Sequence, residues 1–157
     1  MKLVRLFVLF SMVLMMSRVI VAQAPQHIPA SSIPAADLIQ PEELAAQLAD
    51  KKAEKALILQ VGSHVMFAQA HIPGSEYAGP AGKEDGLQTL KERIADLPKS
   101  TKVVLYCGCC PWDRCPNIAP AYRLLHEQGF TNLKVLYIAE NFGTNWVAKG
   151  YPADKGR

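Results

Sequence analysis

The chain has 157 residues, half of them hydrophobic and one fifth charged, with 17 basic residues against 14 acidic ones. Three of the basic residues and none of the acidic ones lie within the first 18 positions, so the rest of the chain is balanced in charge and gives no indication of nucleic-acid binding. This length suits one domain with a single core and is too short for two.

The first 22 residues are typical of a signal peptide. Two basic residues precede a mostly apolar run over positions 6–21, and small residues follow at Ala22 and Ala24. The run is about sixteen residues long and is interrupted by a serine and an arginine, whereas a membrane-spanning helix needs roughly twenty apolar residues. We therefore expect cleavage after Ala22 or Ala24 and an exported protein, periplasmic if its source is a Gram-negative bacterium, without stable membrane insertion after processing.

Residues 23–37 are rich in proline, alanine and serine, which favours an exposed lead-in to a domain over residues 38–157. Helical patterns then alternate with short apolar runs, whereas residues 64–82 hold several glycines and prolines and are expected to be mostly loop. The predicted elements are helices over 41–55, 86–98 and 118–130, strands over 56–61, 102–106 and 132–138, and a short closing helix over 141–150. This alternation predicts an α/β domain with a mostly parallel central sheet flanked by helices on both faces.

All four cysteines of the chain fall within nine residues, at Cys107, Cys109, Cys110 and Cys115. A disulfide scaffold would distribute its cysteines along the chain to close large loops. The spacing therefore indicates a site and not a structural framework.

Cys107 directly follows the strand predicted over 102–106, and functional groups of open α/β sheets gather at the carboxyl ends of their strands. Backbone N–H groups of the following loop and the positive end of the next helix would lower the pKa of the thiol and favour a nucleophilic thiolate. Cys107 is therefore the predicted catalytic residue, and the alternative is a buried structural cysteine.

Four segments occur in the order and approximate spacing of rhodanese domains, and they span roughly residues 38–153: HIPGS (71–75), VVLYC (103–107), LLHEQGF (124–130) and WVAKGYP (146–152). The chain thus resembles the rhodanese-like (thiosulfate sulfurtransferase) single-domain family. The resemblance implies a rhodanese-like fold and a sulfurtransferase without a cofactor. In such an enzyme Cys107 takes sulfane sulfur from a small anion such as thiosulfate, carries it as a persulfide, and passes it to cyanide, a thiol acceptor or a redox partner protein.

Three departures from the family pattern weaken this resemblance. The usual Asp-x-Arg after the first buried strand is replaced by residues 60–62 (Gln, Val, Gly), and the usual Gly-Gly before the last helix is replaced near Asn141 and Phe142. The loop over residues 107–117 is also longer than the usual cradle, so the anion-binding nest is expected to differ in shape.

The long loop supplies the predicted substrate-binding residues, which are Gly108, Cys109, Cys110, Trp112 and Arg114. Arg114 could bind an anionic donor or pair with Asp113, and the alternative is an ordinary solvated loop charge. Trp112 could cover the persulfide or present a surface to a partner, and the alternative is packing on its own domain. Because no Cys-x5-Arg motif is present, a phosphatase or arsenate reductase of related fold is disfavoured. His71 is expected to have a structural role.

The three further cysteines, Cys109, Cys110 and Cys115, allow three interpretations. They could resolve the persulfide by forming a disulfide with Cys107, which would make the protein a thiol-disulfide redox device. They could bind a soft metal such as Zn²⁺ or Cu(I) in a non-enzymatic module that could also bind a partner protein, although the spacing is not a common zinc pattern and adjacent cysteines are not expected to face one ion easily. Cys110 and Cys115 could instead form a structural disulfide. No metal is assigned from the sequence.

Overall fold

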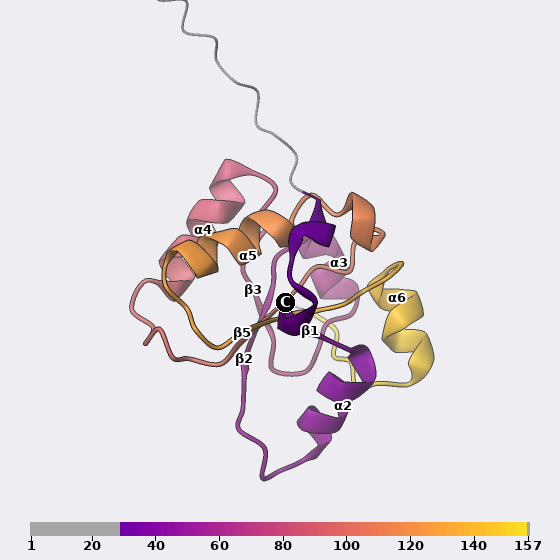
Figure 1. The fold of residues 1–157 in the computed structure, drawn as a ribbon. Coiled ribbons are helices and arrows are strands. Elements are labelled where there is room, and N and C mark those ends of the chain that lie inside the picture. The colour runs from indigo at the N-terminus through magenta and orange to yellow at the C-terminus, as the bar shows by residue number, and fades with distance from the viewer. Residues whose placement is uncertain (1–28, 157) are drawn as a thin grey trace, which may run out of the picture.

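The computed structural model describes residues 29–156 (Figure 1). The predicted signal peptide and its cleavage site lie outside the described residues. The helices are α2 (Pro41–Ala49), α3 (His64–Gln69), α4 (Glu84–Ile94), α5 (Ile118–Glu127) and α6 (Phe142–Asn145), and the strands are β1 (Leu38–Ile39), β2 (Leu57–Gln60), β3 (Glu76–Tyr77), β4 (Val103–Tyr106) and β5 (Leu133–Leu136). None of the helices in this part of the chain is long and apolar enough to span a membrane.

The strands form one five-stranded sheet in the order β1-β5-β4-β2-β3, and every pairing is parallel. β4 lies at the centre, where Leu105 pairs with Leu59 of β2 on one side and with Val135 of β5 on the other. All four residues of β4 are buried, as expected for a parallel strand that is covered on both faces. The predicted α/β class with a mostly parallel sheet is confirmed.

Helices cover both faces of the sheet. Because side chains alternate in direction along each strand, each strand contributes to a core layer on either face. Val103, Leu105 and Cys107 belong to the core layer that also contains buried residues of α4 and α5. Val104 and Tyr106 belong to the opposite layer, with buried residues of α2 and α6. Figure 1 shows α4 and α5 on one side of the strands and α2 on the other.

The segment over residues 64–82, expected to be mostly loop, contains both α3 and β3. α3 has six residues and β3 has two, which is too short for a hydrophobic period to appear in the sequence. β1, also two residues long, was missed for the same reason.

The first predicted helix is shorter than expected. α2 begins with Pro41 at its first position, where the missing N–H costs no hydrogen bond, but it ends at Ala49 and not at residue 55. Beyond it, the Asp50 carboxylate accepts a hydrogen bond from the backbone N–H of Lys52 at 2.8 Å. This local bond stabilises a turn in place of a further helical turn.

The expected lead-in is exposed along most of residues 31–37, but not throughout. Ala30 and Ile33 are buried in the same core layer as Cys107. The prediction of a wholly exposed lead-in is therefore wrong at these two residues, which attach the segment to the domain.

Candidate active site

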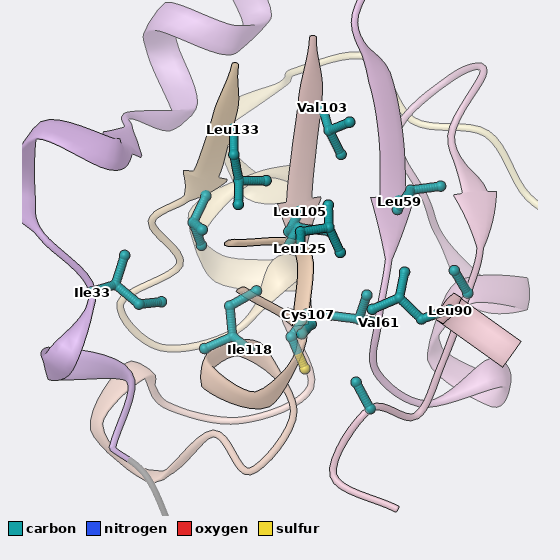
Figure 2. Packing of buried hydrophobic residues seen from close by; sticks show 14 of the residues in the cluster. Ile33, Leu59, Val61, Leu90, Val103, Leu105, Cys107, Ile118, Leu125 and Leu133 are labelled. Carbon is teal, nitrogen blue, oxygen red and sulfur yellow. The ribbon is translucent and has the colours of Figure 1, made fainter. Parts of the chain in front are cut away.

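Cys107 lies at the carboxyl end of the central strand, and its side chain enters the core layer between the sheet and helices α4 and α5. Figure 2 shows its sulfur at the lower edge of this layer, near Ile118 and Val61. Only 5% of the residue is exposed to solvent. The topology thus gives Cys107 the position predicted from the sequence, at the end of a buried strand and the start of a loop.

Glycine at position 62 allows the chain to approach the thiol closely. A Cβ atom placed on Gly62 would lie 2.8 Å from Cys107 Sγ, a separation that real side chains essentially never show. Any larger residue at this position would therefore displace the sulfur or the loop.

The Gln60 side chain links the backbone of Gly62 to that of Cys107 by hydrogen bonds. Its Oε1 accepts a hydrogen bond from Gly62 N–H at 3.1 Å, and its Nε2 donates to the carbonyl of Cys107 at 3.3 Å. The side chain is 2% exposed, so these bonds satisfy polar groups that water does not reach. The replacement of the family's Asp-x-Arg by residues 60–62 therefore does not leave the site unsupported, because a neutral amide provides the contacts.

Asn117 is the residue before α5, and its side chain is oriented by a backbone contact. Its Oδ1 accepts a hydrogen bond from Gly82 N–H at 2.9 Å, which leaves its Nδ2 to donate toward Cys107 Sγ at 3.4 Å and Cys109 Sγ at 3.6 Å. One fixed amide thus contacts two sulfur atoms and would stabilise negative charge on either.

The loop brings the thiols of three cysteines together. Cys109 Sγ lies 3.1 Å from Cys107 Sγ and 3.4 Å from Cys110 Sγ. The sulfur atoms of these three residues all lie within 4.8 Å of one another. All four cysteines, including the buried Cys115, are free thiols in this structure, so the alternative disulfide between Cys110 and Cys115 is not formed.

The charge distribution in this cluster differs from the sequence-based expectation. The pKa of Cys107 lies well above its usual range because its thiol donates toward the neighbouring cysteine sulfurs and is buried. The pKa of Cys109 is lowered chiefly because its sulfur accepts a hydrogen bond from the Cys107 thiol. The pKa of Cys110 is also lowered, chiefly by the hydrogen bond from Cys107. The predicted lowering at Cys107 is therefore wrong for the fully reduced site: the favoured thiolate is the half-buried Cys109.

The long loop is fastened to the rest of the domain at two points. Phe142 N–H donates to the carbonyl of Gly108 at 2.9 Å, and Gly108, at φ +73°, sits so close to Phe142 that a Cβ atom would lie 2.7 Å from the Phe142 Cβ. Trp112 N–H donates to the carbonyl of Ala139 at 3.0 Å, and the Trp112 ring packs edge-on against Tyr137. Trp112 thus packs on its own domain, which is one of the interpretations made from the sequence. It also borders a space of about 10 Å³ beside Cys107.

A larger cavity of about 250 Å³ opens beside Cys107. Its lining combines apolar groups with a few polar ones: Gln60, Met66, Gln69, Ala70, Tyr106, Cys107, Gly108, Phe142, Gly143, Val147 and Lys155. Lys155 is the only cationic residue in that lining. The chain end is held there because Asp154 and His71 exchange two backbone hydrogen bonds and Gly156 N–H donates to the carbonyl of Ala68.

Arg114, the basic residue singled out from the sequence, is exposed and borders neither of the two spaces beside Cys107. His71 is buried; its ring stacks on Phe67 with the centroids 4.1 Å apart, and its Nδ1 lies 2.9 Å from the Phe67 carbonyl oxygen. These contacts fit the structural role expected for His71.

Three residues of the site were not predicted from the sequence. Gln60 and Asn117 make hydrogen bonds there, and Lys155 lines the cavity. Gln60 is the last residue of β2, which pairs with the strand that precedes Cys107. A polar residue at the end of such a buried strand could have indicated a site residue. Asn117 immediately precedes a helix, where a cap was the natural expectation. Lys155 left no signal, because only the folded C-terminal segment brings it to the cavity.

The comparisons with known proteins agree with this architecture. A family model described as "Rhodanese-like domain" matches residues 40–138. A crystal structure of the Alr3790 protein from Anabaena sp. is 22% identical, with a TM-score of 0.56 over 75% of this chain and 92% of that chain. The BH2092 protein from Bacillus halodurans is 17% identical, with a TM-score of 0.57 over 75% of this chain and 76% of that chain. At these identities the likeness is one of fold alone. No curated protein matches the sequence.

Proposed function

The chain belongs to the rhodanese-like domain family, and from this we propose that it is a sulfurtransferase that carries sulfane sulfur as a persulfide on Cys107. The observation that carries the proposal is the place of Cys107 at the carboxyl end of the central strand, in the lining of a cavity that also includes Lys155. A cavity with a cation and the proposed nucleophile in its lining suits a small anionic donor.

The first half-reaction forms one S–S bond and breaks another. The Cys107 thiolate attacks the sulfane sulfur of thiosulfate, the S–S bond of thiosulfate breaks, and sulfite leaves with the bonding electron pair. In the second half-reaction a nucleophile, cyanide or a thiolate, attacks the outer sulfur of the persulfide. The Cys107 thiolate is then released, so each cycle needs no cofactor and no net oxidant.

Cys107 holds a proton in the resting site, and that proton must leave before the attack. The nearest acceptor is Cys109 Sγ at 3.1 Å, and the Asn117 amide lies within reach of both sulfurs. The resting pKa values favour the proton on Cys107, so we propose that its transfer to Cys109 populates only a minor Cys107 thiolate form, which Asn117 stabilises and the attack on thiosulfate consumes. The persulfide anion formed afterwards would remain next to the same amide.

The proposal is tested by sulfite release from thiosulfate, with cyanide or a small dithiol as acceptor. The reduced wild-type protein is expected to turn over, and Cys107→Ser to lose activity to the background rate. The control is Cys115→Ser, which removes a thiol outside the three-sulfur cluster and is expected to retain activity. Turnover of Cys107→Ser at the wild-type rate would overturn the proposal.

A second function is favoured by one specific observation, the 3.1 Å separation of Cys107 Sγ and Cys109 Sγ. The Cys109 thiolate could attack Cys107 of the persulfide, form a Cys107–Cys109 disulfide and expel the outer sulfur as hydrosulfide. A dithiol or redox partner protein would then reduce the disulfide. Sulfide release that Cys109→Ser abolishes, while Cys107 of that variant still gains a sulfur in a single turnover, even at a lower rate, distinguishes this redox device from simple transfer to an external acceptor.

A further inference from the structure

Three sulfur atoms form a compact set of ligands at the loop. Those of Cys107, Cys109 and Cys110 all lie within 4.8 Å of one another, with two separations of 3.1 and 3.4 Å. Cys107 is buried and the other two are half-buried, so the cluster reaches from the core toward solvent. Adjacent Cys109 and Cys110 therefore do face a common point, contrary to the sequence-based expectation.

The sulfurs lie slightly closer together than those around a thiolate-bound metal. Metal–sulfur bonds of about 2.3 Å place two ligand sulfurs of a tetrahedral or trigonal site about 3.8–4.0 Å apart. The sulfur of Cys109 would need to move away from those of Cys107 and Cys110 by roughly 0.4–0.9 Å to admit an ion between them. Deprotonation favours that separation, because the S–H contacts that draw the sulfurs together disappear and like charges repel.

We propose that Cys107, Cys109 and Cys110 bind one soft d¹⁰ cation, with Cu(I) as the preferred ion. The ligand set consists of thiolates alone, and soft thiolates select Cu(I) and Zn²⁺ over the harder cations that carboxylates bind. Structural Zn²⁺ sites use four protein ligands, whereas this set has three, and three thiolates suit a trigonal Cu(I) ion.

Two contacts around the cluster fit an anionic, metal-binding set of ligands. The Asn117 Nδ2 donates toward the sulfurs of Cys107 and Cys109 and would hold both in place as ligands. The metal and a persulfide would compete, since both need the sulfur of Cys107.

The test is a titration of the fully reduced, metal-free full chain with Cu(I) under anaerobic conditions, in competition with a chromophoric Cu(I) chelator. We expect one ion per chain, with ultraviolet sulfur-to-copper charge-transfer absorption. Cys109→Ser and Cys110→Ser should each weaken the affinity at least about tenfold, since even the loss of an outer partner of a ligand typically costs that much. Cys115→Ser is the matched control and should bind like the wild type.

A second arm uses Zn²⁺ alone and then adds Cu(I), and we expect the copper to displace the zinc. Zinc that resists displacement would overturn the choice of ion. Equal Cu(I) affinity in wild type and in the folded Cys109→Ser and Cys110→Ser variants, checked by circular dichroism, would overturn the site itself. Because binding is measured without sulfur transfer, failure here is distinct from failure of the proposed enzyme activity.

Discussion

At the residue scale, the site depends on how a single negative charge is shared among adjacent thiols. Cys107 is the buried residue at the end of β4, yet its pKa is raised, whereas the half-buried Cys109 beside it has its pKa lowered. The Cys107 thiol donates its hydrogen bond to Cys109 Sγ, and a thiolate is the better acceptor. The proposed nucleophile and the favoured thiolate of the resting site are therefore two different residues.

This separation predicts the order in which the thiols react with an alkylating agent. In reduced, metal-free protein, Cys109 should be labelled first, and its labelling should persist well below pH 7 because its pKa is lowered. Cys107 should lag until alkaline pH, because its pKa is raised and it is buried. The measurement is peptide mapping after timed iodoacetamide pulses across the pH range. Earlier labelling of Cys107 than of Cys109 at neutral pH would contradict this charge distribution.

At the scale of elements, the ends of two adjacent strands act together. β2 and β4 pair in register, with Gln60 opposite Tyr106, so the residues that follow each strand meet at one edge of the sheet. Gln60 uses this adjacency to link the Gly62 N–H to the Cys107 carbonyl. The loop thus takes its shape from a side chain on the neighbouring strand.

Replacing this link predicts a loss of stability. Gln60→Leu keeps a similar volume but leaves the buried Gly62 N–H and Cys107 carbonyl without the partners that Gln60 provides, which costs about 1–3 kcal/mol. Urea denaturation should show this as a lower midpoint with an unchanged slope. The matched control is Gln69→Leu, at an exposed position near the end of α3, which should change stability by less than about 0.5 kcal/mol. A Gln60→Leu protein as stable as the wild type would show that the two hydrogen bonds of the Gln60 side chain do not contribute to stability.

The elements that could be predicted from the sequence are those long enough to show a period. α4 and α5 each have ten or more residues, and the four-residue strands β2, β4 and β5 are continuous apolar or nearly apolar runs, so all were found. Cys107 was found because a strand end is visible in the sequence. The charge of Cys109 and the contacts of Asn117 depend on side-chain directions in a folded loop, which no local pattern encodes.

At the scale of the whole molecule, the two ends of the described chain are both fixed close to the functional layer. Ala30 and Ile33 complete the core layer that contains Cys107. At the other end, the Asp154–His71 bridge holds the final segment so that Lys155 borders the Cys107 cavity. The fold thus brings Lys155 into the lining of the same cavity as the proposed nucleophile, which lies 48 residues earlier in the chain.

The position of Lys155 predicts a role in binding the anionic donor. Lys155→Gln should raise the KM for thiosulfate while leaving kcat nearly unchanged, because the cation attracts the donor but does not touch the bond that breaks. Since Lys155 is exposed, the effect should be modest, about fivefold, and should shrink as salt is added. The control is Lys51→Gln, an exposed lysine that does not border this cavity. Equal KM values for wild type and Lys155→Gln at low ionic strength would remove Lys155 from the binding site.

The most direct test of the central claim is to locate the transferred sulfur. Reduced protein is incubated with thiosulfate, its free thiols and persulfides are blocked, and the peptides are sequenced by tandem mass spectrometry. We predict one added sulfur atom, carried by Cys107, in the wild type and in Cys115→Ser, and none in Cys107→Ser. An added sulfur carried by Cys109, or none on any cysteine, would contradict the assignment of Cys107 as the persulfide carrier.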